Sequence, residues 1–254
     1  KKIEDDMDFI YDDYKKIINL LLRNNYGIIK YRDDTQYSKK AILRHDVDIS
    51  LEKAVEFAQY EKALDVKSTY FILLNSKLYN IFNKNSIEMI MHIKELGHDI
   101  GLHFDETNYA LPSAYDERNE KIKELIIHEK NVMEKIIPGI KIESVSMHMP
   151  SKQTLEADLH FEDNFINSYS CKFFKKHKYI SDSNMHWREN IYETIASGQY
   201  DNLHILTHPI WYDVNYNSKT DKISKLLLEK KNMIYNEVCN ISPGIEDDIK
   251  LEDF

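Results

Sequence analysis

Residues 41–48 read Ala-Ile-Leu-Arg-His-Asp-Val-Asp, a short apolar run that ends in charged side chains. The apolar part predicts a buried β-strand, and alternation along that strand places Asp46 and Asp48 on one face and His45 on the other. Ser50 comes next, and a serine in front of an apolar-periodic segment is typical of a helix N-cap. The stretch therefore predicts a strand, a short polar loop and a helix in succession.

Strand and helix patterns alternate along the rest of the chain. Further strands are predicted at 68–74, 99–104, 144–148, 165–169, 178–180 and 203–207. Helices are predicted at 51–64, at 86–96, after a Ser113-x-x-Asp116 capping box, from about Asn190 and from about Asp221. This order is typical of parallel strands joined by helical crossovers, and roughly six or seven of them indicate an α/β fold that closes into a (β/α) barrel. The chemistry of such a barrel lies at the carboxyl ends of its strands.

An amphipathic helix precedes the first of these strands. Its apolar residues at helical spacing are Met7, Ile10, Tyr14, Ile17, Ile18 and Leu21. No repeat, proline-rich linker or low-complexity tract interrupts the chain. We therefore expect an N-terminal helical extension over residues 1–40, packed on a single barrel domain over residues 41–254.

Composition excludes several classes of protein. The 254 residues are 42% hydrophobic and 30% charged, which is enough to bury one large core. A net charge of -9 disfavours nucleic acid as a partner. The longest apolar runs are far shorter than the ~20 residues that span a bilayer, and no signal-peptide core is visible, so we expect a soluble, cytoplasmic protein. Its two cysteines, Cys171 and Cys239, are expected to be reduced thiols.

Four of the predicted strands end in aspartate or histidine. These residues are Asp46 and Asp48, His103 and Asp105, His148, and His208. A carboxylate with imidazoles is a ligand set for a divalent ion such as Zn²⁺, which would activate water and polarise a carbonyl. Each residue alone has a structural interpretation, because aspartate is common in turns and most histidines bind no metal. Recurrence at four strand ends favours a metal site.

The same motifs resemble a known family. Arg44-His45-Asp46-Val47-Asp48, Ser68-Thr69-Tyr70-Phe71 and the segment 97–103 are similar to the opening half of the polysaccharide deacetylase (NodB-homology) family, in its HDVD-type branch. Ser181-Asp182-Ser183 with Trp187-Arg188, and Leu206-Thr207-His208-Pro209 with Trp211, resemble the later motifs of that branch. The resemblance covers roughly residues 41–215. It implies a distorted (β/α) barrel, one divalent ion, with Zn²⁺ expected ahead of cobalt, nickel or manganese, and hydrolysis of an acetyl group on a sugar.

The resemblance also implies roles for individual residues. Asp46 corresponds to the catalytic base of the family, Asp48 to its metal-binding aspartate and His103 to its first metal-binding histidine. His208 lies in the late motif that supplies the general acid. These assignments make Asp46 and His208 the expected catalytic pair.

One ligand of the family is missing from its usual place. Family members have a second metal-binding histidine four residues after the first, and that position is Thr107 here. Asp105 or His148 could replace it. We favour His148, because it alternates with two serines toward one face of its strand and a proline ends the strand nearby.

Six residues are candidates for substrate binding. They are Arg44, Asp105, Asp182, Trp187, Arg188 and Trp211. The aromatic residues could stack on a sugar ring and Arg188 could meet a phosphate or carboxylate, although loop aromatics equally often close a barrel mouth by packing. Arg44 could instead pair with Asp46 and keep it ionised, or form an exterior ion pair.

The expected function is metal-dependent removal of an acetyl group, here an N-acetyl group, by hydrolysis of a C–N bond that is not a peptide bond. A nucleotide-linked or lipid-linked sugar used in capsule or lipopolysaccharide biosynthesis is the expected substrate. The missing histidine motivates an alternative, a carbohydrate-binding barrel without catalysis. A third interpretation is a hydrolase of another amide or ester, since a barrel and a metal site specify chemistry better than substrate.

Overall fold

The computed structural model describes residues 7–33 and 37–253 of the chain. It divides into two units, one ending at Val214 and the other beginning at Asn215. All the strands lie in the first unit. The residues expected as one barrel domain, 41–254, are thus distributed over both units, and part of the expected 1–40 extension falls outside the described residues.

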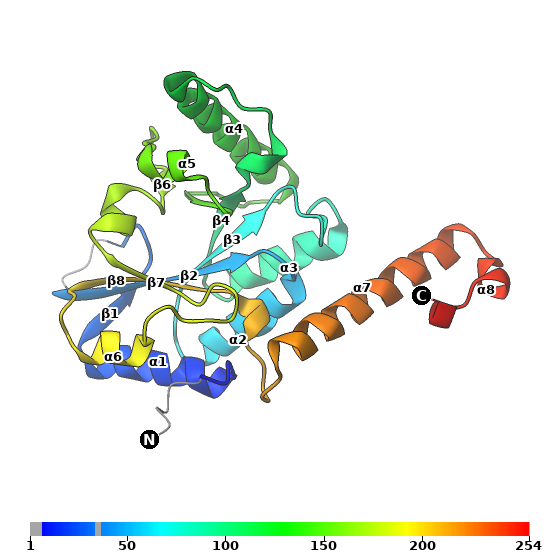
Figure 1. The fold of residues 1–254 in the computed structure, drawn as a ribbon, viewed down its shortest axis with the longest axis horizontal. Coiled ribbons are helices and arrows are strands. Elements are labelled where there is room, and N and C mark those ends of the chain that lie inside the picture. The colour runs from blue at the N-terminus through cyan, green and yellow to red at the C-terminus, as the bar shows by residue number, and fades with distance from the viewer. Residues whose placement is uncertain (1–6, 34–36, 254) are drawn as a thin grey trace. The chain divides into compact units, whose positions relative to one another are not determined.

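The first unit is built on one curled sheet of parallel strands (Figure 1). In spatial order its strands are β6 (Ile166–Asn167), β5 (Ser144–Met147), β4 (Asp99–Phe104), β3 (Thr69–Leu73), β2 (Lys39–Val47), β8 (Asn202–Thr207) and β7 (Lys178–Ser181). Among the described residues no ladder joins β6 to β7. The expected distorted (β/α) barrel is therefore confirmed, as a half-barrel open between these two strands.

One further strand, β1 (Tyr26–Ile29), pairs with the first half of β2. Its register places Tyr26 beside Lys39 and Ile29 beside Ile42. This strand was not predicted, because four residues directly after a helix carry too little alternation to be recognised as a strand. The N-terminal extension therefore contributes a strand to the sheet as well as a helix.

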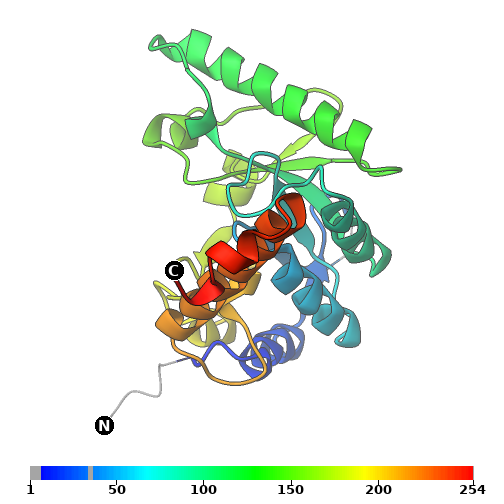
Figure 2. The ribbon, with the colours of Figure 1, turned by 90° about the vertical axis from the view of Figure 1, so that its right-hand side faces the viewer.

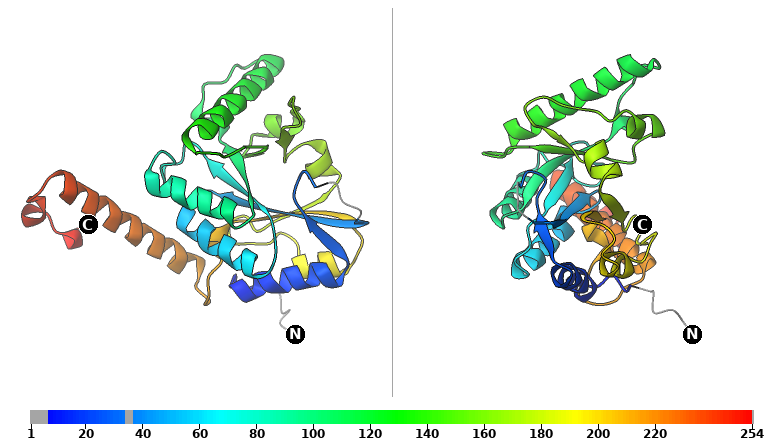
Figure 3. Two further views of the ribbon diagram at one scale, coloured as in Figure 1. Left: turned by 180° about the vertical axis from the view of Figure 1, so that it is seen from behind. Right: turned by 90° about the vertical axis from the view of Figure 1, so that its left-hand side faces the viewer.

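Helices cover the sheet along its length. In the first unit they are α1 (Tyr11–Arg23), α2 (Leu51–Ala63), α3 (Lys84–Glu95), α4 (Tyr115–Ile136), α5 (Lys152–Glu156) and α6 (Ile191–Ala196), with short 3-10 turns at Glu106–Asn108 and Pro209–Trp211 and a π turn at Cys171–Lys175. Helices α2 and α3 lie side by side (Figure 3), and α1 and α4 lie at opposite ends of the layer of strands (Figures 1 and 2).

The helix starts test two capping predictions. The hydroxyl of Ser50 accepts the backbone N–H of Lys53 at 3.2 Å, which confirms the predicted N-cap of α2. The capping box predicted at Ser113 is wrong, because α4 has Ala114 as its N-cap and no side-chain cap. One residue of offset removes the geometry that the box requires.

A buried carboxylate holds α1 on the sheet. Glu61 of α2 accepts the hydroxyls of Tyr14 at 2.5 Å, Ser68 at 2.6 Å and Tyr70 at 2.8 Å. It also lies 3.0 Å from Nε2 of His45. Burial by itself would raise the pKa of Glu61, but His45, His98 and the hydrogen bond from Ser68 outweigh it and lower that pKa to about 2. The expected packing of the N-terminal helix is thus built on a charged, fully bonded group.

The second unit is helical. It contains α7 (Lys219–Ile241), α8 (Ile245–Asp248) and a 3-10 turn at Leu251–Asp253. Ser218 caps α7, since its hydroxyl accepts the backbone N–H of Asp221 at 3.1 Å. In the described part of the chain, no helix combines the length and the apolar character that crossing a membrane requires.

Candidate metal centre

Parallel strands bring the predicted polar residues to one edge of the sheet. Neighbouring strands β5, β4, β3, β2 and β8 all run in the same direction, so their carboxyl ends lie together. Asp48 follows β2, His103 lies near the end of β4, His148 follows β5 and His208 follows β8. Four segments far apart in the sequence therefore deliver their side chains to the same region.

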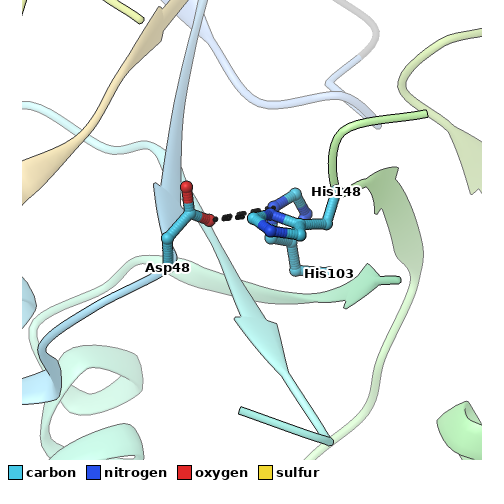
Figure 4. Close-up of side chains that lie close together, drawn as sticks. All are labelled: Asp48, His103 and His148. Atoms are coloured by element: carbon cyan, nitrogen blue, oxygen red, sulfur yellow. Dashed lines mark hydrogen bonds and ion pairs between the residues drawn. The ribbon is translucent and has the colours of Figure 1, made fainter. Parts of the chain in front are cut away.

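Three of these side chains point toward one another (Figure 4). The Nε2 atom of His103 lies 3.1 Å from Oδ1 of Asp48, and Nδ1 of His148 lies 3.4 Å from the same oxygen. The two ring nitrogens are 3.1 Å apart. Donor atoms about 2.0–2.2 Å from one ion are separated from each other by about 3.0–3.5 Å. The three distances therefore match a shared divalent ion.

The donor chemistry fits such an ion too. The Oδ1 atom of Asp48 is buried and makes no hydrogen bond of proper geometry, although two imidazole nitrogens lie close to it. A buried oxygen without a hydrogen bond is costly, and a cation would satisfy it. The other ring nitrogen of His103 lies 3.0 Å from the Ser146 hydroxyl, which orients the ring and leaves Nε2 to ligate.

Electrostatics favours the ionised form of the aspartate. Burial alone would raise the pKa of Asp48, but His103 and His148 outweigh it and hold that pKa well below its usual range. Asp48 is therefore ionised in a largely buried position, as a metal ligand would need to be. An anion flanked by two imidazoles is suited to zinc and to similar divalent ions.

Asp105, the other candidate for the replacement ligand, is engaged elsewhere. Its Oδ1 atom accepts the backbone N–H of Thr107 at 2.9 Å and the hydroxyl of Thr107 at 2.7 Å. Both contacts are local and begin the turn after β4. Among the described residues, the group that could hold an ion contains His148 and not Asp105.

Arg44 and Asp46 form a buried ion pair beside these three residues. The guanidinium donates from Nε to Oδ1 at 2.8 Å and from Nη2 to Oδ2 at 2.7 Å. Burial would raise the pKa of Asp46, but the Arg44 charge outweighs it and lowers that pKa. The Oδ2 atom also lies 3.6 Å from Nε2 of His103. An ionised carboxylate is thereby held at the edge of the candidate metal centre.

This pairing corrects the expected substrate-binding role of Arg44. Its side chain is 0% exposed, and besides Asp46 it contacts the hydroxyls of Ser146, Ser168 and Tyr169. With all these partners inside the protein, the guanidinium has no surface to offer a ligand. Of the two ion pairs considered for Arg44, the structure contains the buried one with Asp46.

His208 forms the second charged pair of the site. Its Nδ1 atom lies 2.6 Å from Oδ1 of Asp182, and its Nε2 atom lies 3.8 Å from Oδ2 of Asp48. Burial would lower the pKa of His208, but the Asp182 carboxylate outweighs it and raises that pKa to about 9. The ring is therefore positively charged near neutral pH and faces the metal centre.

Asp182 and Trp211 differ from the sequence analysis. Asp182 is 0% exposed and bonds to His208, so it orients an imidazole and does not contact substrate. Trp211 is only 7% exposed, because the turn that follows β8 packs inward. Burial of this kind depends on how distant segments pack, which local sequence does not reveal.

Trp187 and Arg188 lie in the loop between β7 and α6. The indole N–H of Trp187 donates to the sulfur of Met7 at 3.1 Å. Both residues line a hollow of about 380 Å³ together with Asp13 and Lys16 of α1, and none of the four strand-end residues lines it. Their proposed contact with a sugar therefore stays a prediction.

Two residues that contact the candidate site, Ser146 and Tyr169, were not predicted. Ser146 links the two halves of the site, because it contacts Arg44, Asp46 and the His103 ring. The ring of Tyr169 lies 4.6 Å from the guanidinium of Arg44. Alternation of Ser146 with the metal-ligand candidate His148 was the available signal for the serine.

Comparisons with known proteins yielded structural likenesses only. No protein-family model matches the chain, and no curated protein matches it. One similar structure is a peptidoglycan N-acetylglucosamine deacetylase (16% identity, TM-score 0.42, 86% of this chain and 92% of the other covered). Another is the chitin deacetylase of the fungal pathogen Colletotrichum lindemuthianum (18%, 0.39, 75% and 81%). A third is a CE4 family pseudoenzyme from Bacillus anthracis (13%, 0.39, 78% and 64%).

These names agree with the family that the sequence motifs resemble, the polysaccharide deacetylases. The function proposed below rests on the side chains described above.

Proposed function

We propose that the protein is a divalent-metal-dependent hydrolase that removes the N-acetyl group of an acetylated sugar. The observation that carries this proposal is the meeting of the Asp48, His103 and His148 donor atoms, all within 4.8 Å of one another. They lie beside an anionic carboxylate, Asp46, and a cationic imidazole, His208. Metal-dependent amide hydrolysis combines a Lewis acid, a general base and a general acid at one place.

Asp46 is the proposed general base. Arg44 keeps it ionised, and it lies 3.6 Å from a ligand nitrogen of His103, so it can accept a proton from water bound at the centre. A divalent ion, with Zn²⁺ as the proposed identity, would lower the pKa of that water and polarise the acetyl carbonyl. Asp48, His103 and His148 would hold it.

His208 is the proposed general acid. Asp182 holds its Nδ1 atom, which leaves Nε2 as the atom that faces the reacting groups. As the bond between the acyl carbon and nitrogen breaks, His208 donates its proton to the leaving amine, and acetate and a free amino sugar are released. Since the base must be anionic and the acid cationic, the pH profile of activity should be bell-shaped.

The finer substrate assignment rests on the motifs of the sequence. Their branch of the family is associated with surface polysaccharides, so the proposed substrate is a nucleotide-linked or lipid-linked sugar in capsule or lipopolysaccharide biosynthesis. A cytoplasmic location goes with such a precursor. Trp187 and Arg188 are the proposed contacts to its ring and its phosphate.

A screen for acetate release tests the proposal. Purified protein is analysed for bound metal and then incubated with acetylated nucleotide-sugars and acetylated oligosaccharides, with and without a chelator. Acetate release that the chelator abolishes and added Zn²⁺ restores is the expected result. Bound metal without acetate release from any N-acetylated substrate would contradict the deacetylase assignment.

A second candidate function is favoured by one observation. Thr107 occupies the place where the resembled family has a metal-binding histidine. If the site were too weak for an ion, the barrel would bind carbohydrate without hydrolysing it. Sugar binding that is unaffected by chelator, together with a protein free of metal, would support this alternative.

A further inference from the structure

A buried polar cluster includes Glu106, which lies three residues after the candidate metal ligand His103. Glu106 begins the turn after β4, and its Oε1 atom accepts the backbone N–H of Ser151 at 2.9 Å. Its Oε2 atom accepts the hydroxyl of Thr154 and lies 3.1 Å from Nη2 of Arg118. The three side chains of Glu106, Arg118 and Thr154 are 8%, 8% and 5% exposed. We refer to Glu106, Arg118, Ser151 and Thr154 as the clamp.

Arg118 of α4 completes the clamp. It donates to the Thr154 hydroxyl at 2.9 Å and to the Ser151 hydroxyl at 3.2 Å. Every member thus has a partner within the cluster, and three separate chain segments meet there. A buried network that is fully satisfied in this way is rigid, because breaking one bond leaves a polar group unpaired.

The clamp is connected to both candidate histidine ligands through short stretches of the chain. Glu106 comes three residues after His103, and Ser151 comes three residues after His148. Between these points the backbone N–H of His148 donates to the carbonyl of Phe104 at 2.7 Å. The clamp and this bond hold the end of β4 and the segment after β5 at a set separation.

The chain after His148 needs such support. Met149 has a φ of 43°, a left-handed backbone conformation that non-glycine residues rarely adopt. Its side chain is 78% exposed, so its own packing does little to impose that conformation. Strained backbone of this kind persists only where the surroundings determine it. Two residues later, the clamp supplies that constraint through Ser151.

We propose that Glu106 is a positioning residue that, through the clamp, places His148 as the third metal ligand. In this chain Thr107 cannot ligate as the histidine of the resembled family would, and the ligand arrives from β5 instead. The ligand set is therefore correct only if the β4 and β5 segments keep their separation, which is what the clamp controls. This inference rests on the proposed function for the presence of a metal ion at Asp48, His103 and His148.

The test compares conservative variants with a matched control. Glu106→Gln removes the negative charge that Arg118 faces. Thr154→Val removes the hydroxyl that bonds to both Glu106 and Arg118 and keeps the branched shape of the side chain. The control is Glu134→Gln. Glu134 lies on α4, like Arg118, and it resembles Glu106 in its contacts, because it pairs with Lys130 at 2.7 Å and accepts the backbone N–H of Ile142 at 2.8 Å. Glu134 thus supports the segment before β5, whereas Glu106 supports the segment after β5.

Two measurements are made on each folded variant. The Kd for Zn²⁺, from titration against a chromophoric chelator, should rise roughly 10–100-fold in Glu106→Gln and less in Thr154→Val, and stay unchanged in Glu134→Gln. Hydrogen exchange of the His148 amide in the metal-free protein should become about tenfold faster in Glu106→Gln, and stay unchanged in the control. The second readout does not depend on metal or on activity.

The outcomes separate the inference from the proposed function. Wild-type protein that binds no divalent ion would refute the proposed function and the ligand role of His148. Faster His148 exchange in Glu106→Gln would still support the part of the inference in which the clamp fixes the backbone at His148. Unchanged Kd and unchanged exchange in Glu106→Gln would overturn the clamp. The inference would also be overturned if Glu106→Gln and Glu134→Gln weakened Zn²⁺ binding and accelerated His148 exchange equally. Equal effects would indicate general destabilisation of the protein.

Discussion

The carboxylate of Asp182 holds both the side chain and the backbone of His208. Its Oδ1 atom lies 2.6 Å from Nδ1, and both carboxylate oxygens lie 3.1 Å from the backbone nitrogen of the same residue. Two anchor points fix the direction of the imidazole, and the buried negative charge keeps it protonated. Asp182 is thus the group that keeps the imidazole of His208 protonated up to a raised pKa.

Asp182→Asn should shift the alkaline limb of the kcat/KM profile to lower pH. In the native protein the pKa of His208 is raised to about 9, so the acid form persists until the pH rises through that value. Without the Asp182 charge the limb should move toward the ordinary imidazole range. The measurement is the pH dependence of acetate release, with metal content as a control that should not change. An unmoved limb would show that another group titrates there.

His208→Gln should lower acetate release by about 10²–10⁴, the usual contribution of a general acid. Metal content, measured by elemental analysis, should be retained, because His208 is not among the three residues whose donor atoms converge. Loss of the ion in this variant would instead identify His208 as a ligand.

Asp46→Asn should abolish most turnover and spare the metal. The amide keeps the size of the carboxylate and removes the base, so acetate release should fall by about 10²–10⁴. Because Arg44 would then be a buried charge without its partner, the free energy of unfolding should also fall, by about 3–5 kcal/mol. Elemental analysis and urea unfolding check the two effects. Full activity in a folded Asp46→Asn protein would remove Asp46 from the mechanism.

Three further variants identify the ligand set. Asp48→Asn and His148→Gln should each lower metal content along with activity, and excess metal should partly restore both, since each removes one donor. Asp105→Asn is the matched control, because Asp105 bonds to Thr107 and should leave metal content unchanged. If Asp105→Asn loses the ion and His148→Gln keeps it, the assignment of the third ligand is reversed.

Acid should destabilise the protein through Glu61. Its pKa of about 2 in the folded protein lies below the ordinary value of 4.5, so its stabilising contribution is complete above pH 4.5 and is lost as the pH falls from 4.5 toward 2. The contribution is on the order of 3 kcal/mol. Glu61→Gln should lower stability at neutral pH and flatten the dependence on pH in that window. Urea unfolding at several pH values measures this, and an unchanged slope would contradict it.

Most of the strands were predictable from local patterns. The strand that ends in Asp46 and Asp48, and those that end near His103, His148 and His208, lie close to their predicted ranges. Apolar runs bounded by polar residues identify such strands because burial of one continuous stretch is a local property. Alternation also assigned Asp46 and Asp48 to the face opposite His45, which bonds to Glu61 on the other side of the sheet.

Features that depend on strand pairing, on long-range contacts or on the burial of a side chain were not predictable from the sequence. Strand β1 is defined by its ladder with Lys39 to Ile42, and the boundary at Val214 by how the chain clusters in space. Arg44, Asp182 and Trp211 have the residue types of a binding surface, yet they are buried, because distant segments cover them. The residue type of a charged or aromatic side chain therefore does not reveal whether that side chain is buried or exposed, because this depends on the segments that pack around it.

The sequence by itself determined that aspartate and histidine end four parallel strands, and strand direction alone then requires these residues to share one edge of the sheet. Only the tertiary structure shows which of Asp105 and His148 lies with Asp48 and His103. Asp105 is close to His103 along the chain, but it bonds to its own turn. His148 follows β5 and is directed at Asp48, which follows β2, across the ends of β4 and β3. Which donors converge depends on the separation of strands that are distant in sequence, and no local pattern carries that distance.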